Sequence, residues 1–273
     1  MTARRIERAR RLHALHRPGE PLVLTNVWDA ATARLVEQAG APALATASAS
    51  VSWSLGVRDG GGLTRELAVA QLALVAGAVE VPVTADLEDG YAGTPAGVGE
   101  TVAAALEAGA VGANLEDGGA GPGLRPLDDA VARVSAARAA ADAAGVPLYL
   151  NARTDVYLHG VGEPADRLEL ALTRGRAFLA AGADGFFVPG IADPAEIAAL
   201  AKEFRLNVLA GPGLPTVGEL AALGVARISL GPGPAKAAYA AVRRVAEEVY
   251  GAGTYGALEG GLDYGELNGL FAN

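Results

Sequence analysis

An apolar run in the first third of the chain ends abruptly in three carboxylates and a glycine, within residues 82–91. Asp86 and Glu88 follow Val83 and Ala85, whose apolar side chains are typical of a buried strand. Side chains alternate along a strand, so we expect Asp86 and Glu88 to point to the same side. Two carboxylates on one side of a strand end form an oxygen-rich site that favours Mg²⁺, with Mn²⁺ as an alternative. A solvated acidic turn is the competing interpretation of this stretch when it is taken alone.

Polar side chains also stand where other apolar segments end. They are Asn26, Trp28 and Asp29 after the first segment, Thr46, Ser48 and Ser50 after the second, Asn114 and Glu116 after the fourth, and Asn151, Arg153 and Asp155 after the fifth. Alternation places Asn114 with Glu116 on one face of a strand, and it does the same for Asn151 with Arg153. A core arginine–carboxylate network is the structural alternative to a binding site, because ion pairs that serve only packing also cluster in this way.

These side chains need a scaffold that brings several strand ends together. Five glycine junctions, at 39–42, 108–111, 144–147, 181–184 and 223–226, each separate a helical segment from an apolar one, as helix C-caps do. We expect strands at 22–26, 43–47, 81–86, 111–116, 147–153, 185–188, 206–210 and 226–230. We expect helices at 29–39, 64–80, 94–108, 127–144, 164–181, 193–203, 216–223 and 234–250.

Eight alternating units predict an α/β fold, a closed (β/α)8 TIM barrel whose catalytic groups lie at the C-terminal ends of the strands. We expect residues 1–273 to form this single domain, with an extra N-terminal helix and a C-terminal helical extension at 251–273. A doubly wound open sheet is the main alternative. It usually carries a glycine-rich fingerprint after its first strand, and residues 25–29 contain no glycine.

The composition of the chain argues against several classes of catalysis, metal site and binding partner. The chain has no cysteine, which excludes disulfides, thiolate nucleophiles and cysteine-held metals. Its net charge of -9 argues against a nucleic acid or a membrane surface as partner. Schiff-base catalysis has only Lys202 and Lys236 as candidates, and neither is expected at a strand end. The arginine-rich opening is followed by no apolar signal segment, so we expect a cytoplasmic protein whose first helix carries His13 and His16 at the surface.

With these residues assembled, the chain resembles the isocitrate lyase/phosphoenolpyruvate mutase superfamily from about Pro21 onward. The segments that carry the resemblance are Asn26-Val27-Trp28-Asp29-Ala30 with Ala33-Arg34-Leu35, Ser54-Leu55-Gly56-Val57-Arg58-Asp59, Asp86-Leu87-Glu88-Asp89-Gly90-Tyr91, Gly112-Ala113-Asn114-Leu115-Glu116-Asp117 and Ala152-Arg153-Thr154-Asp155. The resemblance implies a small 2-oxo acid substrate, a Mg²⁺ cofactor and an enolate stabilised by the metal.

The resemblance also implies roles for individual residues. Asp86 and Glu88 match the metal pair, and Glu116 matches an acid that reaches the metal through water. Asp59 matches an acid near metal and substrate, and Arg153 the group that holds the substrate carboxylate and the enolate. The backbone N–H groups of 46–48 match the segment that receives the anionic end of the substrate. The predicted catalytic residues are Arg153, Asp59 and Glu116, and the predicted substrate contacts are Trp28, Thr46, Ala47, Ser48, Asp86, Asn151 and Arg153.

The chain departs from the lyases of this superfamily where they carry a cysteine and a histidine after the fourth strand. Here residues 118–126 contain four glycines and neither of those residue types. We therefore expect a carbon–carbon lyase or decarboxylase of a small 2-oxo (di)carboxylic acid, not an isocitrate lyase. The alternatives are a phosphonopyruvate-type mutase or hydrolase and a non-catalytic 2-oxo acid-binding protein. A phosphate-handling barrel is a further alternative, because the Gly-Pro-Gly turns at 211–213 and 231–233 follow the last two strands, where barrels usually bind phosphate.

Two further segments are predicted to move or to assemble. The glycines of 118–126 predict a mobile lid over the site. In the tail, Tyr264, Leu267, Leu270 and Phe271 recur at helical spacing and form an apolar face without an obvious place on the barrel. The resemblance implies a homo-oligomer, a tetramer in which the C-terminal helix crosses to a neighbouring protomer. A tail folded back on its own barrel is the alternative.

Overall fold

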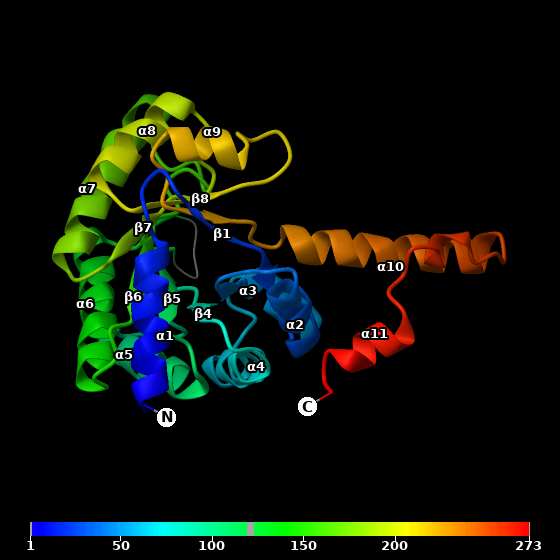
Figure 1. The fold of residues 1–273 in the computed structure, drawn as a ribbon. Coiled ribbons are helices and arrows are strands. Elements are labelled where there is room, and N and C mark those ends of the chain that lie inside the picture. The colour runs from blue at the N-terminus through cyan, green and yellow to red at the C-terminus, as the bar shows by residue number, and fades with distance from the viewer. Residues whose placement is uncertain (1, 119–122, 273) are drawn as a thin grey trace.

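A closed ring of parallel strands forms the centre of the molecule. The computed structural model describes residues 2–118 and 123–272. The strands are β1 (Leu22–Leu24), β2 (Asn26–Val27), β3 (Leu44–Thr46), β4 (Val83–Asp86), β5 (Gly112–Glu116), β6 (Tyr149–Arg153), β7 (Gly185–Phe187), β8 (Leu206–Leu209) and β9 (Arg227–Ser229). Only Thr25 separates β1 from β2; β1 pairs with β9 and β2 with β3, so these two segments act as one bent strand that closes the ring. The predicted (β/α)8 barrel is confirmed (Figure 1).

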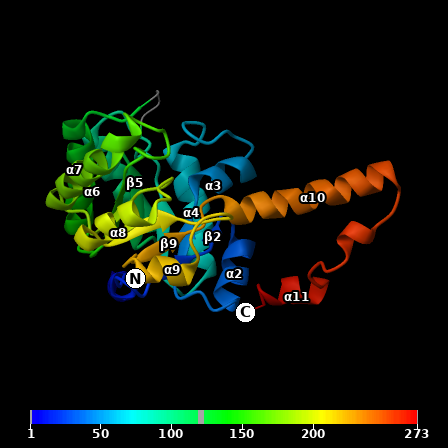
Figure 2. The same ribbon diagram turned by 90° about the horizontal axis from the view of Figure 1, so that it is seen from above.

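Helices surround this ring at the positions that the sequence predicts. They are α2 (Ala30–Gln38), α4 (Arg65–Ala78), α5 (Pro95–Ala108), α6 (Leu127–Ala143), α7 (Arg167–Ala180), α8 (Pro194–Glu203) and α9 (Val217–Ala222), seen from above in Figure 2. Asp29 and Thr32 form a capping box at the start of α2, and the Thr94 hydroxyl caps α5. Gly109 ends α5 with φ of 109°, and the other four junction glycines also have positive φ, which confirms their predicted place just after each helix.

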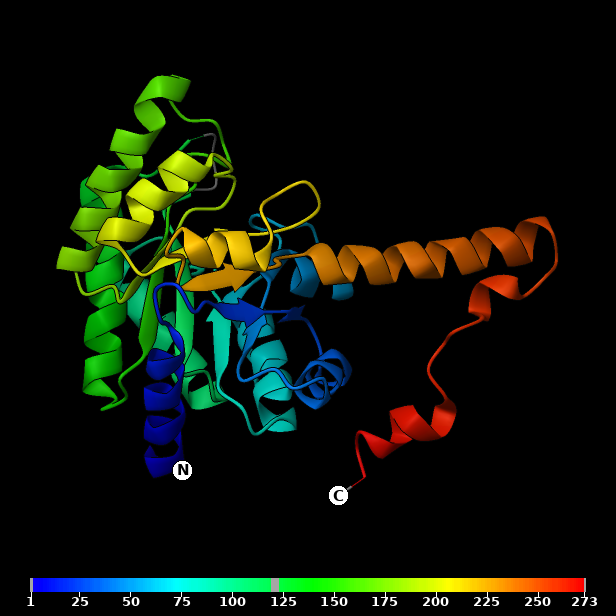
Figure 3. The same cartoon turned by 45° about the horizontal axis from the view of Figure 1, so that its top comes forward.

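Two elements differ from the expectation. Residues 48–54 form a helix, α3 (Ser48–Ser54), where the sequence suggested the end of a strand and a loop. The eighth helix, α10 (Gly233–Gly251), projects away from the barrel in all three ribbon views and buries only Ala235 (Figures 1, 2 and 3). The short helix α11 (Tyr264–Gly269) returns toward α2. Among the described residues, no helix combines the length and apolar character that a membrane crossing requires.

The N-terminal helix α1 (Thr2–Leu15) covers the floor of the barrel rather than lying loosely on its surface. His16 directly follows it and is only 3% exposed, contrary to the expectation of a surface group. Its Nδ1–H donates to the Leu12 carbonyl oxygen at 2.8 Å, and its ring stacks on Tyr149 with centroids 3.6 Å apart. Burial, with the Arg227 charge acting in the same direction, lowers the pKa of His16 to about 3.

This buried histidine should make the protein less stable in mild acid. The unfolded chain takes up a proton as the pH falls through about 6.5, while folded His16 stays neutral until about pH 3. Its contribution to stability is therefore complete above pH 6.5 and should fall by about 2 kcal/mol between pH 7 and pH 5. Urea unfolding of the natural protein and of His16→Phe at pH 7, 6 and 5 measures this contribution. The unfolding free energy of the natural protein, relative to that of His16→Phe, should fall by about 2 kcal/mol from pH 7 to pH 5. Parallel pH dependences would contradict the prediction.

Candidate active site

A cavity of about 250 Å³ opens at the C-terminal ends of the strands, where the barrel fold leads us to expect the site. Side chains from most of the strands reach it, so it collects groups that are far apart in the sequence. Its described lining residues are Asn26, Ala47, Ser48, Ala49, Asp59, Asp86, Asn114, Arg153, Leu158, Phe187, Pro189, Leu209, Ser229, Gly231 and Pro232.

Asp86, the last residue of β4, is fixed by its neighbours on β3 and α3. Its backbone N–H donates to the Thr46 hydroxyl oxygen at 2.9 Å, and its Oδ2 accepts the Ser48 backbone N–H at 3.0 Å. The Ser48 amide, which the resemblance assigns to the substrate, therefore binds Asp86 here. The other oxygen, Oδ1, is buried and has no hydrogen-bond partner among the described residues.

Glu88 does not continue the alternation of β4. The strand ends at Asp86, and Glu88 adopts φ of 48°, so the argument that both side chains share one strand face does not apply. Its Oε2 accepts the Gly61 backbone N–H at 3.3 Å, while its buried Oε1 has no partner among the described residues. Glu88 lines a hollow next to the cavity rather than the cavity itself. Burial, together with the negative charges of Asp86 and Asp59, raises the pKa of Glu88 to about 7.

Arg153, at the end of β6, is held by carboxylates on two sides. Its Nη1 lies 2.8 Å from Glu116 Oε2 on the adjacent strand β5, and its Nε lies 2.6 Å from Asp155 Oδ1. The guanidinium also sits over the Phe187 ring, 5.7 Å from its centroid. Burial raises the pKa of Glu116, and Arg153 opposes that shift. The side chain is thus positioned to bind an anion in the cavity with the part of its fork that Glu116 and Asp155 do not occupy.

A second polar layer lies below, and its pairing agrees with the predicted faces. Asn151 Nδ2 donates to Asn114 Oδ1 at 2.9 Å, directly beneath the Arg153–Glu116 pair in the register of β5 and β6. Asn114 lines the cavity, whereas Asn151 is fully buried behind it. Asp59 reaches the cavity from the loop after α3, and burial next to Asp86 raises its pKa.

A buried ion network supports the loops behind the site. Asp117 accepts hydrogen bonds from the Thr154 hydroxyl at 2.6 Å and from Arg174 Nη1 at 3.0 Å. Arg174 also binds the Arg125 carbonyl oxygen, and Arg125 forms an ion pair with Asp89. This network ties the loop that carries Glu88 to residues after β5. Gly118 and Leu124 form an isolated antiparallel bridge; residues 119–122 of the predicted lid lie outside the described residues, so the lid stays a prediction.

The predicted site residues fall into two groups. Ala47, Ser48, Asp59, Asp86 and Arg153 line the cavity. The other predicted site residues lie around the cavity. The Thr46 hydroxyl accepts the Asp86 backbone N–H, Asn151 donates to Asn114, and Glu116 pairs with Arg153. Glu88 lines the neighbouring hollow, and the Trp28 ring lies near Tyr239 of α10, with ring centroids 6.4 Å apart. Sequence reasoning did not find the apolar lining, because Leu158, Phe187 and Leu209 carry no signal that distinguishes them from core residues.

The carboxylates fit a divalent cation, although no tight group of three potential metal ligands is preformed among the described residues. Asp86 Oδ1 and Glu88 Oε1 are buried oxygens without partners, and leaving such groups unpaired is costly. Burial and the charge of Asp86 both raise the pKa of Glu88. A hard cation would satisfy the free oxygens and offset the clustered negative charge, and carboxylate oxygens are the ligands that Mg²⁺ prefers.

The chain is similar in sequence and in fold to known proteins. It matches the phosphoenolpyruvate phosphomutase family over residues 12–250. Its fold is similar to that of a crystal structure from Burkholderia cenocepacia J2315, provisionally assigned as a phosphonomutase, with a TM-score of 0.85 and 44% identity over 89% of this chain and 99% of that chain. It is also similar to a phosphonopyruvate hydrolase solved with oxalate and Mg²⁺, with a TM-score of 0.82 and 26% identity over 96% of this chain and 95% of that chain. An oxaloacetate decarboxylase of Bradyrhizobium sp. (strain ORS 278) is 28% identical over 257 residues, which are 90% of this chain and 83% of that protein.

Proposed function

The chain belongs to the phosphoenolpyruvate phosphomutase family, within the isocitrate lyase/phosphoenolpyruvate mutase superfamily, and we propose that it is a Mg²⁺-dependent carbon–carbon lyase or decarboxylase of a small 2-oxo acid. One observation carries this proposal: a carboxylate with a free buried oxygen, Asp86, and an oriented guanidinium, Arg153, line the same cavity. A 2-oxo acid presents a carboxylate and a keto oxygen side by side, which suits a cation on one side and a guanidinium on the other.

In this proposal Asp86 is the direct ligand of Mg²⁺, and Glu88 and Glu116 reach the ion directly or through water. When bound, the ion would polarise the keto oxygen and stabilise the negative charge that develops on it. Asp86 is held for this task by Thr46 and Ser48, so its free oxygen is oriented before the ion arrives.

Arg153 binds the substrate carboxylate or the enolate oxygen. Its orientation is set in advance by Glu116 and Asp155, so little reorganisation is needed as negative charge develops during bond cleavage. Asp59 is the acid in the cavity whose pKa is raised by burial. We assign it the task of holding a proton near C3 of the substrate, where the enolate must be protonated after the bond breaks.

Oxaloacetate is the first substrate with which to test this function. Its disappearance and the appearance of pyruvate are followed with Mg²⁺ and, in parallel, after removal of the metal with a chelator. We expect turnover that depends on Mg²⁺ or Mn²⁺. Release of phosphate from phosphonopyruvate, measured under the same conditions, would instead favour C–P bond chemistry, and binding of 2-oxo acids without turnover of either compound would favour a sensor.

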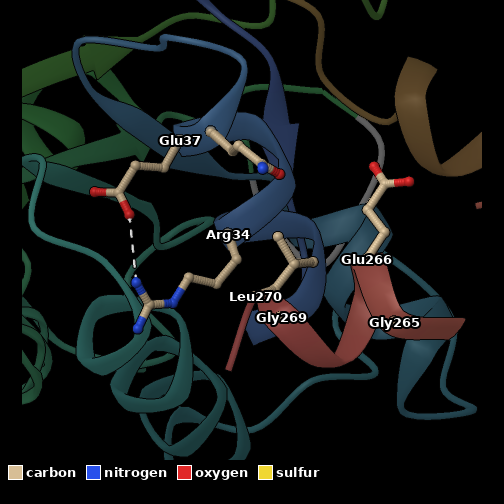
Figure 4. A pocket seen from close by; sticks show the side chains of 7 residues that line it. Arg34, Glu37, Gly265, Glu266, Gly269 and Leu270 are labelled. Atoms are coloured by element: carbon tan, nitrogen blue, oxygen red, sulfur yellow. Dashed lines mark ion pairs between the residues drawn. The ribbon is translucent and has the colours of Figure 1, made fainter. Parts of the chain in front are cut away.

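We further propose that α10 and the tail mediate assembly into a tetramer. The helix and tail expose many large apolar side chains, several of them at least half exposed: Val242, Tyr250, Tyr255, Leu258, Tyr264 and Phe271. Helix α11 lies beside α2, but a hollow of about 450 Å³ remains between them, lined by Arg34, Glu37 and Leu270 among others (Figure 4). The tail therefore does not bury its apolar face on its own barrel, and each such side chain would gain about 1.5–3 kcal/mol from full burial. The projecting part begins at Gly233, earlier than the tail at 251–273 that the sequence suggests.

Truncation tests this assembly. In light scattering, we expect the full chain to be a tetramer, a chain ending at Gly251 to form smaller or weaker oligomers, and a chain ending at Pro232 to be monomeric. The physical reason is that the second truncation removes the whole projecting helix and its apolar face. A full chain that is monomeric, or a chain ending at Pro232 that keeps the tetrameric mass, would show that α10 does not mediate assembly.

A further inference from the structure

The mouth of the barrel has two chemically different halves. The half formed by the ends of β4 to β6 and the loop after α3 contributes Asp59, Asp86, Asn114 and Arg153 to the cavity. The rest of the lining includes the polar side chains of Asn26 and Ser229, which are hydrogen-bonded within the barrel. It is otherwise dominated by five apolar residues: Leu158 from the loop after β6, Phe187 and Pro189 at the end of β7, Leu209 at the end of β8 and Pro232 after β9. We call these five residues the apolar wall. A 2-oxo acid bound by Asp86 and Arg153 would extend its remote end toward this wall.

Positive charge is confined to one place in this cavity. Among its described lining residues, Arg153 is the one cationic side chain, and Glu116 and Asp155 already bind it. Arg125 points to Asp89, Asp129 and the Gly118 carbonyl oxygen, and it lines the neighbouring hollow. Lys236 is exposed on the first turn of α10 and is not among the lining residues. A second carboxylate at the remote end would therefore lack a counter-charge.

The backbone also offers few free N–H groups that could bind a carboxylate at the remote end of the substrate. Helix α10 begins beside Pro232, and a helix start often binds anions through free N–H groups. Here the N–H groups of Leu230 and Gly231 both donate to the Asn26 carboxamide oxygen, at 3.0 and 2.8 Å, and Gly233 donates to the Leu230 carbonyl oxygen. Pro232 and Pro234 have no N–H group. The Gly-Pro-Gly turn after β9 is thus occupied by internal hydrogen bonds, which disfavours a phosphate at this one of the two turns considered from the sequence.

We propose that the site selects 2-oxo acids whose remote end is uncharged and apolar, rather than 2-oxo dicarboxylates with a second retained carboxylate. This inference rests on the proposed function, and it specifies the substrate class of the same site. Placing an unpaired carboxylate against Leu158 and Leu209 carries a desolvation cost, whereas each buried CH₂ group should raise the affinity about fourfold. A leaving group that departs uncharged, such as CO₂, is compatible with this wall.

A matched pair of ligands isolates the charge of the remote end. 2-Oxoglutarate and 5-methyl-2-oxohexanoate share one skeleton, with two carboxylate oxygens in the first replaced by two methyl groups in the second. Neither carries a carboxylate on C3, so neither is a substrate for decarboxylation at that carbon. Calorimetric titration of the full-length protein with each compound, in saturating Mg²⁺, should give at least about tenfold tighter binding of the methyl compound.

A charge introduced on the wall should reverse this preference. Leu158 is 48% exposed, so that Leu158→Arg can place a guanidinium at the cavity rim without disturbing the core. We expect this variant to bind 2-oxoglutarate more tightly than its methyl counterpart. Leu74→Arg on the outer face of α4, where Leu74 is 60% exposed, is the matched control and should keep the original preference. Leu209→Lys provides a second variant on the wall if Leu158→Arg does not fold.

The outcomes separate this inference from the proposed function. If oxaloacetate is turned over with Mg²⁺ but 2-oxoglutarate binds the natural protein as tightly as 5-methyl-2-oxohexanoate, the inference is wrong and the proposed function stands. If Leu158→Arg and Leu209→Lys both fold and neither changes the preference, the wall does not contact the remote end, and the inference is wrong as well. If no 2-oxo acid binds and oxaloacetate is stable, the proposed function is wrong and the inference fails with it.

Discussion

Replacing Asp86 with asparagine is expected to abolish metal binding at the site and to lower kcat/KM for oxaloacetate by about 10³-fold or more. The substitution keeps the shape of the side chain, and its oxygen can still accept the Ser48 backbone N–H that Oδ2 accepts at 3.0 Å. The amide nitrogen then takes the place of Oδ1, the buried oxygen without a partner, and presents a donor to the position where a cation must approach. Paramagnetic titration with Mn²⁺ measures the affinity, and a coupled pyruvate assay measures the rate.

The control for this variant is Asp89→Asn. Asp89 lies on the same loop and carries the same charge, but its carboxylate pairs with Arg125 outside the cavity. We expect Asp89→Asn to lose stability while it retains Mn²⁺ binding within a few fold. Equal loss of Mn²⁺ affinity in both variants would mean that Asp86 acts only through its charge. Unchanged affinity in Asp86→Asn would place the metal elsewhere.

The second large effect is expected for Arg153→Lys, which should lower kcat/KM by about 10²–10³-fold and leave the fold intact. The guanidinium contacts Glu116 with Nη1 and Asp155 with Nε, and its planar fork can face the cavity at the same time. An ammonium group is a single point of charge, so lysine cannot hold both carboxylates and also present a fixed pair of donors to the substrate. Because the positive charge remains, the Glu116 carboxylate is not left unpaired, and thermal unfolding should change little.

Two comparisons distinguish a catalytic arginine from a structural one. Arg174→Lys alters another buried arginine, whose partners are Asp117 and the Arg125 carbonyl oxygen outside the cavity, and it should lower kcat/KM far less than Arg153→Lys does. Arg153→Ala should recover part of its activity when guanidinium is added to the assay, because the small cation can occupy the space left by the side chain. Full activity in Arg153→Lys would assign the arginine to the core network that the sequence alone left open.

The residues around the cavity also show where strand alternation predicts the face of a side chain and where it does not. The pairs Asn114–Glu116 and Asn151–Arg153 lie on common faces, as alternation predicts, because both residues of each pair belong to one regular strand. The same argument does not apply to Asp86 and Glu88, since β4 ends at Asp86 and Glu88 turns into the left-handed region. Alternation holds only while the ladder continues, and the residue where it ends is decided by contacts with other strands.

What the sequence by itself determined is therefore the local and periodic part of this protein. The capping residues, the junction glycines and eight apolar segments predict the barrel, because each depends on neighbouring residues in the chain. The polar strand ends then predict Asp86 and Arg153 as site residues, because a barrel brings those ends to one mouth.

Tertiary contacts alone decided the rest. His16 is buried because Tyr149, far along the chain, lies against it, and Leu158, Phe187 and Leu209 become a wall only when three strand ends meet. Helix α10 has the amphipathic pattern of a barrel helix and nevertheless projects from the barrel. The pattern predicts that one face of the helix is buried, but it does not predict which surface covers that face. Apolar periodicity describes one side of a contact, and the partner is known only once the chain has folded.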